Sequence, residues 1–118
     1  MRRTISVLAA LVGASLTLAV PALADSTATG VAVTAGKPGE FKFILSKTSV
    51  TRGAVTFTVT NKGKLEHDFK IAGKKTVRLK PGRTTTLTVT LRAAGRAAYL
   101  CTLPGHAAGG MKGSLTVK

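Results

Sequence analysis

Apolar and polar residues alternate along most of the chain after position 24, and this period of two constrains the fold more than any other feature. The segments AVTFTVT (residues 54–60) and TTTLTVTL (residues 84–91) carry phenylalanine, valine or leucine at alternate positions, with threonine between them. Side chains of a β-strand point to opposite faces with this period. Each segment therefore predicts a strand with one buried face and one solvated face.

Shorter runs of the same kind predict further strands, and turn residues separate them. These runs lie around Val31, Phe43, Ile71, Val77, Tyr99 and Leu115. Pro81-Gly82 suits a type II turn, because proline sets φ at the first central position and glycine accepts a positive φ at the second. About eight short strands, with no helical pattern after residue 24, predict an all-β protein built as an antiparallel sandwich or barrel.

The first 24 residues have the layout of a cleaved signal peptide. The basic pair Arg2-Arg3 precedes an apolar run, and Ala22-Leu23-Ala24 forms a small-residue cleavage pattern. A membrane anchor is the alternative, but the apolar run is short for a span. We expect cleavage after Ala24, and the sequence leaves open whether export follows the general or the twin-arginine route. The product would be one small domain over residues 25–118, periplasmic or extracellular, without a membrane span.

The chain is strongly basic, with 18 lysine and arginine residues against 4 aspartate and glutamate residues. Such a balance favours an anionic partner, which could be an acidic protein, an anionic surface or nucleic acid. Nucleic acid is the weakest of the three, because aromatic residues make up 4 % of the chain and no recognition motif is present. We therefore expect no nucleic-acid binding.

Three residues with metal-binding side chains lie on one predicted loop. Cys101, His106 and Met111 have the spacing C-x4-H-x4-M, and a strand is predicted on either side of them. Cys101 is the only cysteine, so it forms no disulfide within the chain. A second histidine, His67, stands at the start of an upstream strand. Two imidazoles, one thiolate and a weak axial thioether are the ligand set of a blue copper site.

Taken singly, each of these four residues has a simpler explanation. Cys101 or Met111 would fill a core, His106 would be an exposed loop residue, and His67 would cap a strand. However, the chain holds only two histidines and one cysteine, and Met111 is the only methionine after residue 24. Zinc ordinarily recruits a further strong ligand, and iron–sulfur clusters need more cysteines. The set therefore favours one mononuclear copper ion.

Three segments together resemble the small type 1 copper proteins, or cupredoxins, which include plastocyanin and azurin. The segments are VTFTVTNKGKLEHDF, LKPGRTTTLTVTL and AAYLCTLPGHAAGGMKGSLTV, in that order. The resemblance covers residues 39–118 and implies an eight-stranded Greek-key β-sandwich with one type 1 copper near one end. It carries the ligand roles onto His67, Cys101, His106 and, axially, Met111.

One departure from the family pattern lies beside the first histidine, where the family often has asparagine and this chain has Asp68. We hypothesise that Asp68 accepts a hydrogen bond from the backbone or hydroxyl of Thr102 and so links the two ligand segments. An ionised carboxylate beside the thiolate would also favour Cu(II) and lower the reduction potential. The alternative is a solvated aspartate at the end of a strand.

The residues around His106 are small or apolar and carry no charge. They would let the ligand loop turn tightly, and they would also leave the edge of the His106 ring accessible, which is how the family uses its corresponding histidine. Lys62, Lys64 and Lys112 lie near the ligands in sequence. They would either steer an acidic redox partner towards His106 or act only as solubilising lysines.

The expected function is that of an exported, monomeric electron carrier that cycles one copper between Cu(I) and Cu(II). We expect no enzymatic activity, because nothing in the sequence resembles a nucleophile with its base or a pair of catalytic carboxylates. One alternative is a protein that stores, buffers or delivers copper through the same ligands. Another is a metal-free interaction domain in which the positive charge binds anionic surfaces.

Overall fold

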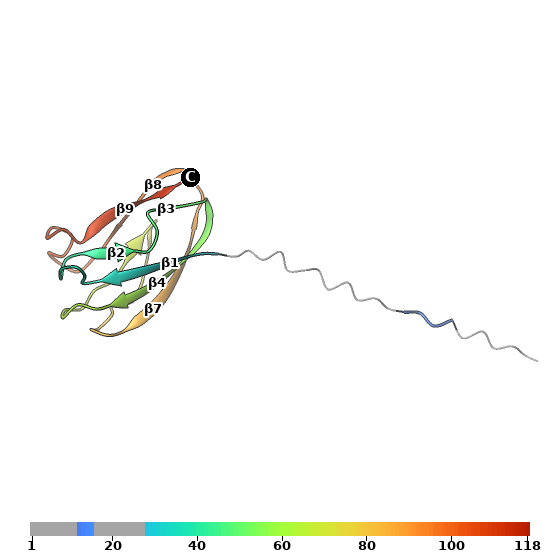
Figure 1. Cartoon of the computed structure of the whole chain (residues 1–118), viewed down its shortest axis with the longest axis horizontal. Helices are drawn as coiled ribbons and strands as arrows, with labels where there is room; N and C mark the ends of the chain where they lie inside the picture. The colour runs from blue at the N-terminus through green and yellow to red at the C-terminus, as the bar shows by residue number, and fades with distance from the viewer. Residues whose placement is uncertain (1–11, 16–27) are drawn as a thin grey trace, which may run out of the picture.

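The structure is a computed structural model that describes residues 12–15 and 28–118. The predicted signal peptide lies almost wholly outside the described residues. The described part of the chain contains nine strands (Figure 1), which are β1 (Thr29–Ala35), β2 (Phe43–Leu45), β3 (Ser49–Val50), β4 (Gly53–Asn61), β5 (Lys70–Ile71), β6 (Lys74–Lys75), β7 (Thr84–Leu91), β8 (Gly95–Leu100) and β9 (Lys112–Val117).

The strands form two sheets that pack face to face. One sheet has the order β2-β1-β4-β7 and the other has the order β3-β9-β8-β5-β6. After β2 the chain passes from one sheet to the other several times, so strands that are neighbours in a sheet are often distant in sequence. The expected all-β Greek-key sandwich is confirmed.

The core lies between the sheets and is filled by the alternating apolar residues. In β4 the side chains of Val55, Phe57 and Val59 are fully buried, while the threonines between them are partly or fully exposed. On the outer face Thr56 and Thr60 form hydrogen bonds with threonines of β7, each 3.0 Å between the hydroxyl oxygens. The alternation therefore places apolar side chains on the buried face of the sheet and hydrogen-bonded threonines on the outer face.

The structure differs from the expected strands and their pairing in several respects. The segment around Val77 forms no strand, and the Val77 side chain is 69 % exposed. Only Leu79 pairs there, through an isolated antiparallel bridge to His67. In addition, β1 pairs with β4 and β3 pairs with β9 in parallel, so the sandwich is not wholly antiparallel. Strands β3 and β6 are not among the predicted strands, because each has two residues, which is too few to show a period of two.

The turn predicted at Pro81-Gly82 is present and has the expected conformation. Gly82 has φ of 84°, and the backbone N–H of Arg83 donates to the carbonyl oxygen of Lys80 at 3.0 Å. The N–H of Gly82 also donates to the carbonyl of Asn61 at 2.8 Å. This turn therefore ties the connection before β7 to the end of β4.

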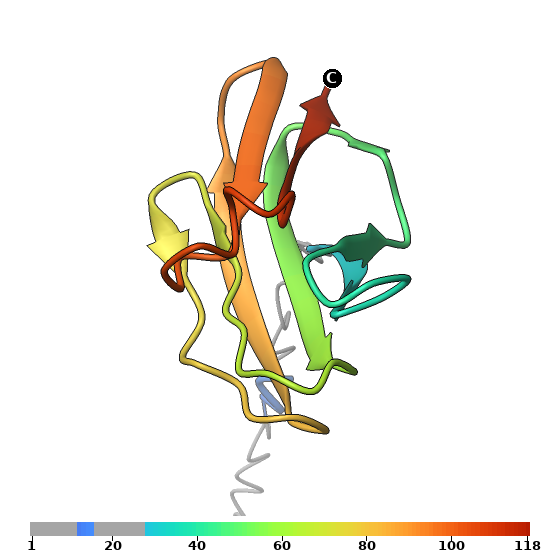
Figure 2. The ribbon, with the colours of Figure 1, turned by 90° about the vertical axis from the view of Figure 1, so that its left-hand side faces the viewer.

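The loops that follow β1, β4 and β8 gather at one end of the sandwich, and the C-terminus lies at the other (Figure 1). Figure 2 looks onto the end where these loops meet. Gly36 and Gly63 bring two of the loops into backbone contact, because a Cβ added to Gly36 would lie 2.5 Å from the Cα of Gly63. Both predicted histidine ligands and Cys101 belong to this end.

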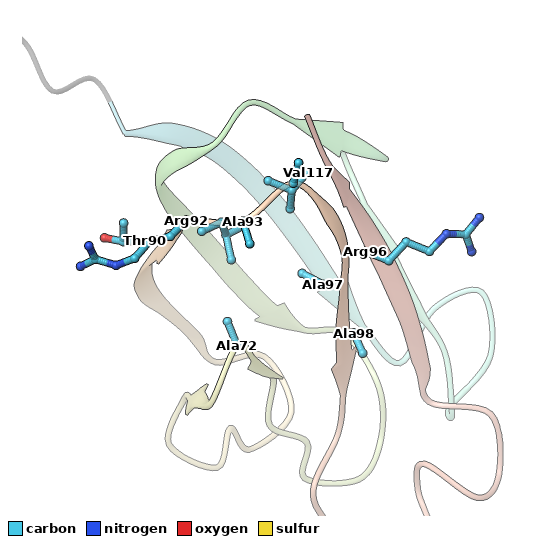
Figure 3. Close-up of a pocket in the computed structure, with 10 residues that line it drawn as sticks. Ala72, Thr90, Arg92, Ala93, Arg96, Ala97, Ala98 and Val117 are labelled. Carbon is cyan, nitrogen blue, oxygen red and sulfur yellow. The ribbon is translucent and has the colours of Figure 1, made fainter.

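A cavity of about 550 Å³ lies at the β7–β8 turn, away from these loops. Its lining includes Ala93, Ala97 and Val117 (Figure 3), and none of the predicted metal ligands borders it. The guanidinium groups of Arg92 and Arg96 point away from its centre. Within the described residues, no helix is long and apolar enough to cross a membrane.

We predict that Phe57→Ala lowers the free energy of unfolding by about 3–5 kcal/mol, because it leaves a cavity in the middle of the core. Phe57 is fully buried, and its ring centroid lies 5.2 Å from that of Phe69. Urea denaturation followed by circular dichroism measures the change. Thr58→Ala, on the exposed face of the same strand, is the control and should cost less than about 1 kcal/mol. Equal losses in the two variants would contradict this account of the core.

Candidate metal centre

The donor atoms of His67, Cys101 and His106 meet in one place. They all lie within 4.8 Å of one another. The two imidazole Nδ1 atoms are 3.2 Å apart, and Nδ1 of His106 lies 3.5 Å from the sulfur of Cys101. Two segments that are more than thirty residues apart in sequence therefore present three donors to one point.

Backbone hydrogen bonds shape the loop that carries two of these donors. Cys101 follows the last residue of β8, and its N–H donates to the carbonyl of Met111 at 3.1 Å. The N–H of Met111 donates in turn to the carbonyl of His106 at 3.0 Å. Gly105 and Gly110 have φ of 82° and 110°, which side-chain-bearing residues rarely adopt. The loop thus folds back on itself and brings His106 close to Cys101.

The Cys101 thiol is buried and lies beside Asp68. The sulfur accepts a hydrogen bond from the backbone N–H of Asp68 at 3.5 Å, and the residue is 1 % exposed. Burial raises the pKa of the thiol above its usual value, and the backbone N–H groups of Asp68 and Leu103 partly oppose this change. Because the thiolate is the metal-binding form, metal binding at neutral pH would displace the proton from this sulfur.

The Asp68 side chain joins the two ligand segments directly. Its Oδ1 accepts from the backbone N–H of Thr102 at 2.6 Å, and its Oδ2 accepts from the Thr102 hydroxyl. Asp68 is 2 % exposed, so it is not a solvated strand-end residue. Both donors belong to Thr102, the residue after Cys101, so these hydrogen bonds hold Cys101 next to the segment that carries His67.

His106 lies at the surface side of the site. It is partly exposed, and its ring makes an edge contact with Phe41, at 5.0 Å between centroids and 61° between planes. Burial, followed by the charge of nearby His67, lowers the pKa of His106. The neutral imidazole is therefore favoured, which is the form that binds a metal. Phe41 and Leu65, on the neighbouring loops, add exposed apolar side chains at this end of the molecule.

Met111 is buried in the same region. It has no exposed surface and packs with Cys101 and Ala35 in a small cluster separate from the main core. The four residues predicted from the sequence thus lie at one end of the sandwich, three of them with their donor atoms close together.

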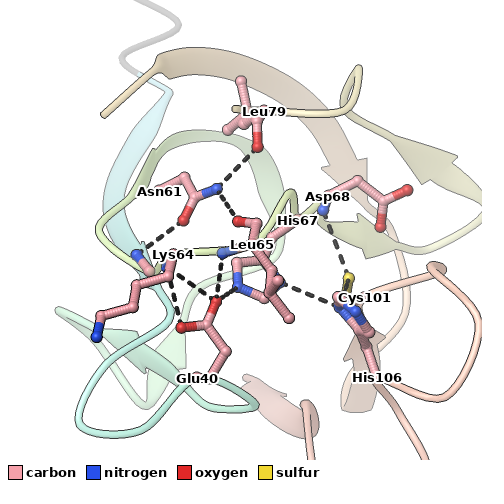
Figure 4. A network of polar contacts seen from close by, with 10 residues as sticks. Glu40, Asn61, Lys64, Leu65, His67, Asp68, Leu79, Cys101 and His106 are labelled. Carbon is pink, nitrogen blue, oxygen red and sulfur yellow. Dashed lines mark hydrogen bonds and ion pairs between the residues drawn. The ribbon is translucent and has the colours of Figure 1, made fainter. Parts of the chain in front are cut away.

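Sequence reasoning missed two residues that organise the site, Glu40 and Asn61 (Figure 4). Glu40 Oε1 lies 2.7 Å from Nε2 of His67. Asn61 is fully buried, and its amide nitrogen donates to the carbonyls of Leu65 and Leu79, each at 2.8 Å. No sequence spacing links Glu40 to His67, and Asn61 belongs to Asn61-Lys62-Gly63, a sequence typical of an ordinary turn.

The donors match the chemistry of a copper ion. Imidazole suits copper in both oxidation states, and a soft thiolate with a thioether favours Cu(I). In the described part of the chain no buried side-chain nitrogen or oxygen lacks a hydrogen-bond partner. The polar groups around the donors are therefore already satisfied by the protein, and the facing Nδ1 and sulfur atoms form a set that a single ion fits.

Comparison with protein families supports the same cofactor. The family model described as copper binding proteins of the plastocyanin/azurin family matches residues 30–118. The chain belongs to this family. His67, Cys101 and His106 are positioned as its copper-ligand site, consistent with one type 1 copper. A comparison with curated protein sequences finds no match.

Solved structures of similar shape are blue copper proteins. Auracyanin from the photosynthetic bacterium Roseiflexus castenholzii is 26 % identical, with a TM-score of 0.65, and the match covers 77 % of this chain and 98 % of that chain. Rusticyanin from Thiobacillus ferrooxidans is 27 % identical, with a TM-score of 0.63, and the match covers 75 % of this chain and 76 % of that one. These similarities agree with the family and with the sandwich described above.

We predict that the metal-free protein loses stability on acidification partly through Glu40. Hydrogen bonds from the backbone of Lys64 and Leu65, together with His67, lower the pKa of Glu40 from 4.5 to about 2. A carboxyl group with a lowered folded-state pKa stabilises the protein above pH 4.5, and this contribution is lost as the pH falls towards 2.

The stability difference between wild type and Glu40→Gln should therefore be largest above pH 5 and shrink as the pH approaches 2. Urea midpoints measured across this range test it. A difference that stays constant from neutral to acid pH would contradict the assignment.

Proposed function

We propose that the protein is an electron carrier in which His67, Cys101 and His106 bind one copper ion, with Met111 as the axial ligand. The observation that carries this proposal is the convergence of the three donor atoms within 4.8 Å at one end of the sandwich. Membership of the plastocyanin/azurin family and the likeness to auracyanin and rusticyanin support it. Copper, when bound, accepts and releases one electron between Cu(II) and Cu(I).

The protein's own contribution is to keep the donors nearly fixed. Phe69, two residues after His67, is fully buried between the sheets. Cys101 directly follows β8 and is linked to the segment that carries His67 by the hydrogen bonds of Asp68. Because the donors are held by a packed core and by satisfied polar groups, a change of oxidation state would require little movement of the chain. We propose no catalytic role for these residues.

We propose that redox partners dock at the end of the molecule where His106 lies. His106 is partly exposed and in contact with Phe41, and small or apolar loop residues surround it. The large excess of basic residues favours an acidic partner, because long-range attraction raises the association rate. We further propose that residues 1–24 direct export to the periplasm or the medium and are then removed.

We predict that residues 25–118 bind one equivalent of Cu(II) and become intensely blue, with a narrow copper hyperfine splitting in the electron paramagnetic resonance spectrum. Cys101→Ala should lose both signals, because the thiolate is their source. Met111→Leu is the matched control: it should keep the blue colour and change only the potential, since the axial ligand is weak.

A colourless wild-type protein, or a copper signal that survives in Cys101→Ala, would contradict the type 1 site. A site that turns blue but rapidly gives up its copper to a chelator, and that shows no reversible potential, would instead favour copper storage or delivery.

We predict that Asp68→Asn raises the reduction potential by roughly 59 mV, which is a tenfold change for one electron. The substitution removes a buried negative charge beside the thiolate while keeping an oxygen that accepts from the Thr102 backbone. Cyclic voltammetry measures the shift. Thr102→Val, which removes only the hydroxyl contact, should change the potential less. An unchanged or lower potential in Asp68→Asn would contradict this role.

A further inference from the structure

We propose that Glu40 is a positioning residue for the metal site, which fixes the orientation and tautomer of His67 and places a negative charge behind it. The inference rests on the proposed copper centre and adds a residue from a third loop. Glu40 lies between β1 and β2, 27 positions upstream of His67 in sequence. It belongs to neither of the two segments that carry the proposed ligands.

The contact with His67 determines which ring nitrogen faces the site. Glu40 Oε1 lies 2.7 Å from Nε2 of His67, and the imidazole has no exposed surface. An ionised carboxylate only accepts hydrogen bonds, so Nε2 must carry the proton. In the neutral ring Nδ1 is then bare, and this is the atom that faces His106 Nδ1 at 3.2 Å. The hydrogen bond on one side of the ring therefore prepares the other side to bind a metal.

The carboxylate is itself held in place by the loop before His67. The backbone N–H of Lys64 donates to Oε1 and Oε2 at 3.0 and 2.9 Å, and the N–H of Leu65 donates to Oε1 at 2.8 Å (Figure 4). The Glu40 side chain is only 26 % exposed. With three donors converging on it, the group has little freedom to turn away from His67. Phe41, the next residue, contacts His106, so this one loop supports both imidazoles.

Gly63 provides the space in which the two groups meet. A Cβ on Gly63 would lie 2.5 Å from Glu40 Oε1 and 2.9 Å from His67 Nε2. Both distances are shorter than van der Waals contact. Any side chain at this position would push the carboxylate and the imidazole apart, so the absence of a side chain at Gly63 is a requirement of the pair.

A carboxylate that accepts from a metal-binding histidine has two effects that can be separated. Its hydrogen bond orients the ring, and its charge makes the imidazole a stronger donor and favours the more positive metal ion. Glu66 offers a comparison, because it is adjacent to His67 in sequence but forms no hydrogen bond with it among the described contacts. If these effects depend on the hydrogen bond to His67, replacing Glu40 should change the reduction potential, and replacing Glu66 should change it much less.

The test compares Glu40→Gln, Glu40→Ala and the control Glu66→Gln. Glutamine keeps an oxygen that can accept from His67 and Leu65 but removes the charge, whereas alanine removes both. We expect Glu40→Gln to remain blue and to bind Cu(II) about tenfold less tightly relative to Cu(I), a rise in potential of about 59 mV. Glu66→Gln should shift the potential by much less.

The second readout needs no copper. In the metal-free protein, ¹⁵N chemical shifts of the imidazole should show His67 protonated at Nε2 in wild type and in Glu40→Gln. Glu40→Ala should lose this single tautomer and, when loaded, should release copper to a chelator faster. Gly63→Ala should also lose the single tautomer and release copper faster, as Glu40→Ala does, although Glu40 itself is unchanged. Gly39→Ala is the control and should do neither, because its added Cβ meets nothing closer than 3.8 Å.

The inference is overturned if Glu40→Gln shifts the potential no more than Glu66→Gln, or if Glu40→Ala retains the wild-type tautomer. Should Glu40→Ala fail to fold, the glutamine and Gly63 variants still decide the question. Failure of the proposed function looks different, because the wild-type protein itself would not turn blue. In that case the tautomer measurement alone supports or rejects the role of Glu40.

Discussion

The contact of Phe69 with three other aromatic rings holds the two sheets and the metal site in one arrangement. Its ring centroid lies 5.4 Å from Phe43, 5.2 Å from Phe57 and 5.5 Å from Tyr99. Phe43 and Phe57 belong to one sheet and Tyr99 to the other. Phe69 follows His67 by two residues and Tyr99 precedes Cys101 by two. Packing of these rings therefore sets the distance between two of the metal-binding residues before any ion is present.

Beyond this aromatic cluster the interior becomes polar, and in the described residues every buried side-chain nitrogen and oxygen atom has a hydrogen-bond partner. Asn61 satisfies the carbonyls of Leu65 and Leu79, Asp68 joins the Thr102 segment, and Glu40 accepts from the loop before His67. A buried polar group without a partner costs about 1–3 kcal/mol, so such a network tolerates few alternative arrangements. This explains how loops, rather than strands, can hold donor atoms in fixed positions.

Much of this organisation was accessible to sequence reasoning. The long strands β4 and β7 were predicted from their period, and the turn at Pro81-Gly82 from the φ angles that its residues favour. The segment around Val77 was wrongly predicted as a strand, because its one buried apolar residue, Leu79, pairs only with His67. The short strands β3 and β6 arise from pairing with neighbours and leave no pattern of their own.

The sequence by itself determined the class of fold and the identity of the candidate donors, because alternation and the scarcity of histidine, cysteine and methionine are properties of the chain alone. The tertiary structure decided which groups support those donors. Glu40 reaches His67 only because Gly36 and Gly63 allow two loops to touch, and Asp68 reaches Thr102 only because β5 pairs with β8. Such contacts depend on how distant segments pack in space, and no local spacing of residues encodes them.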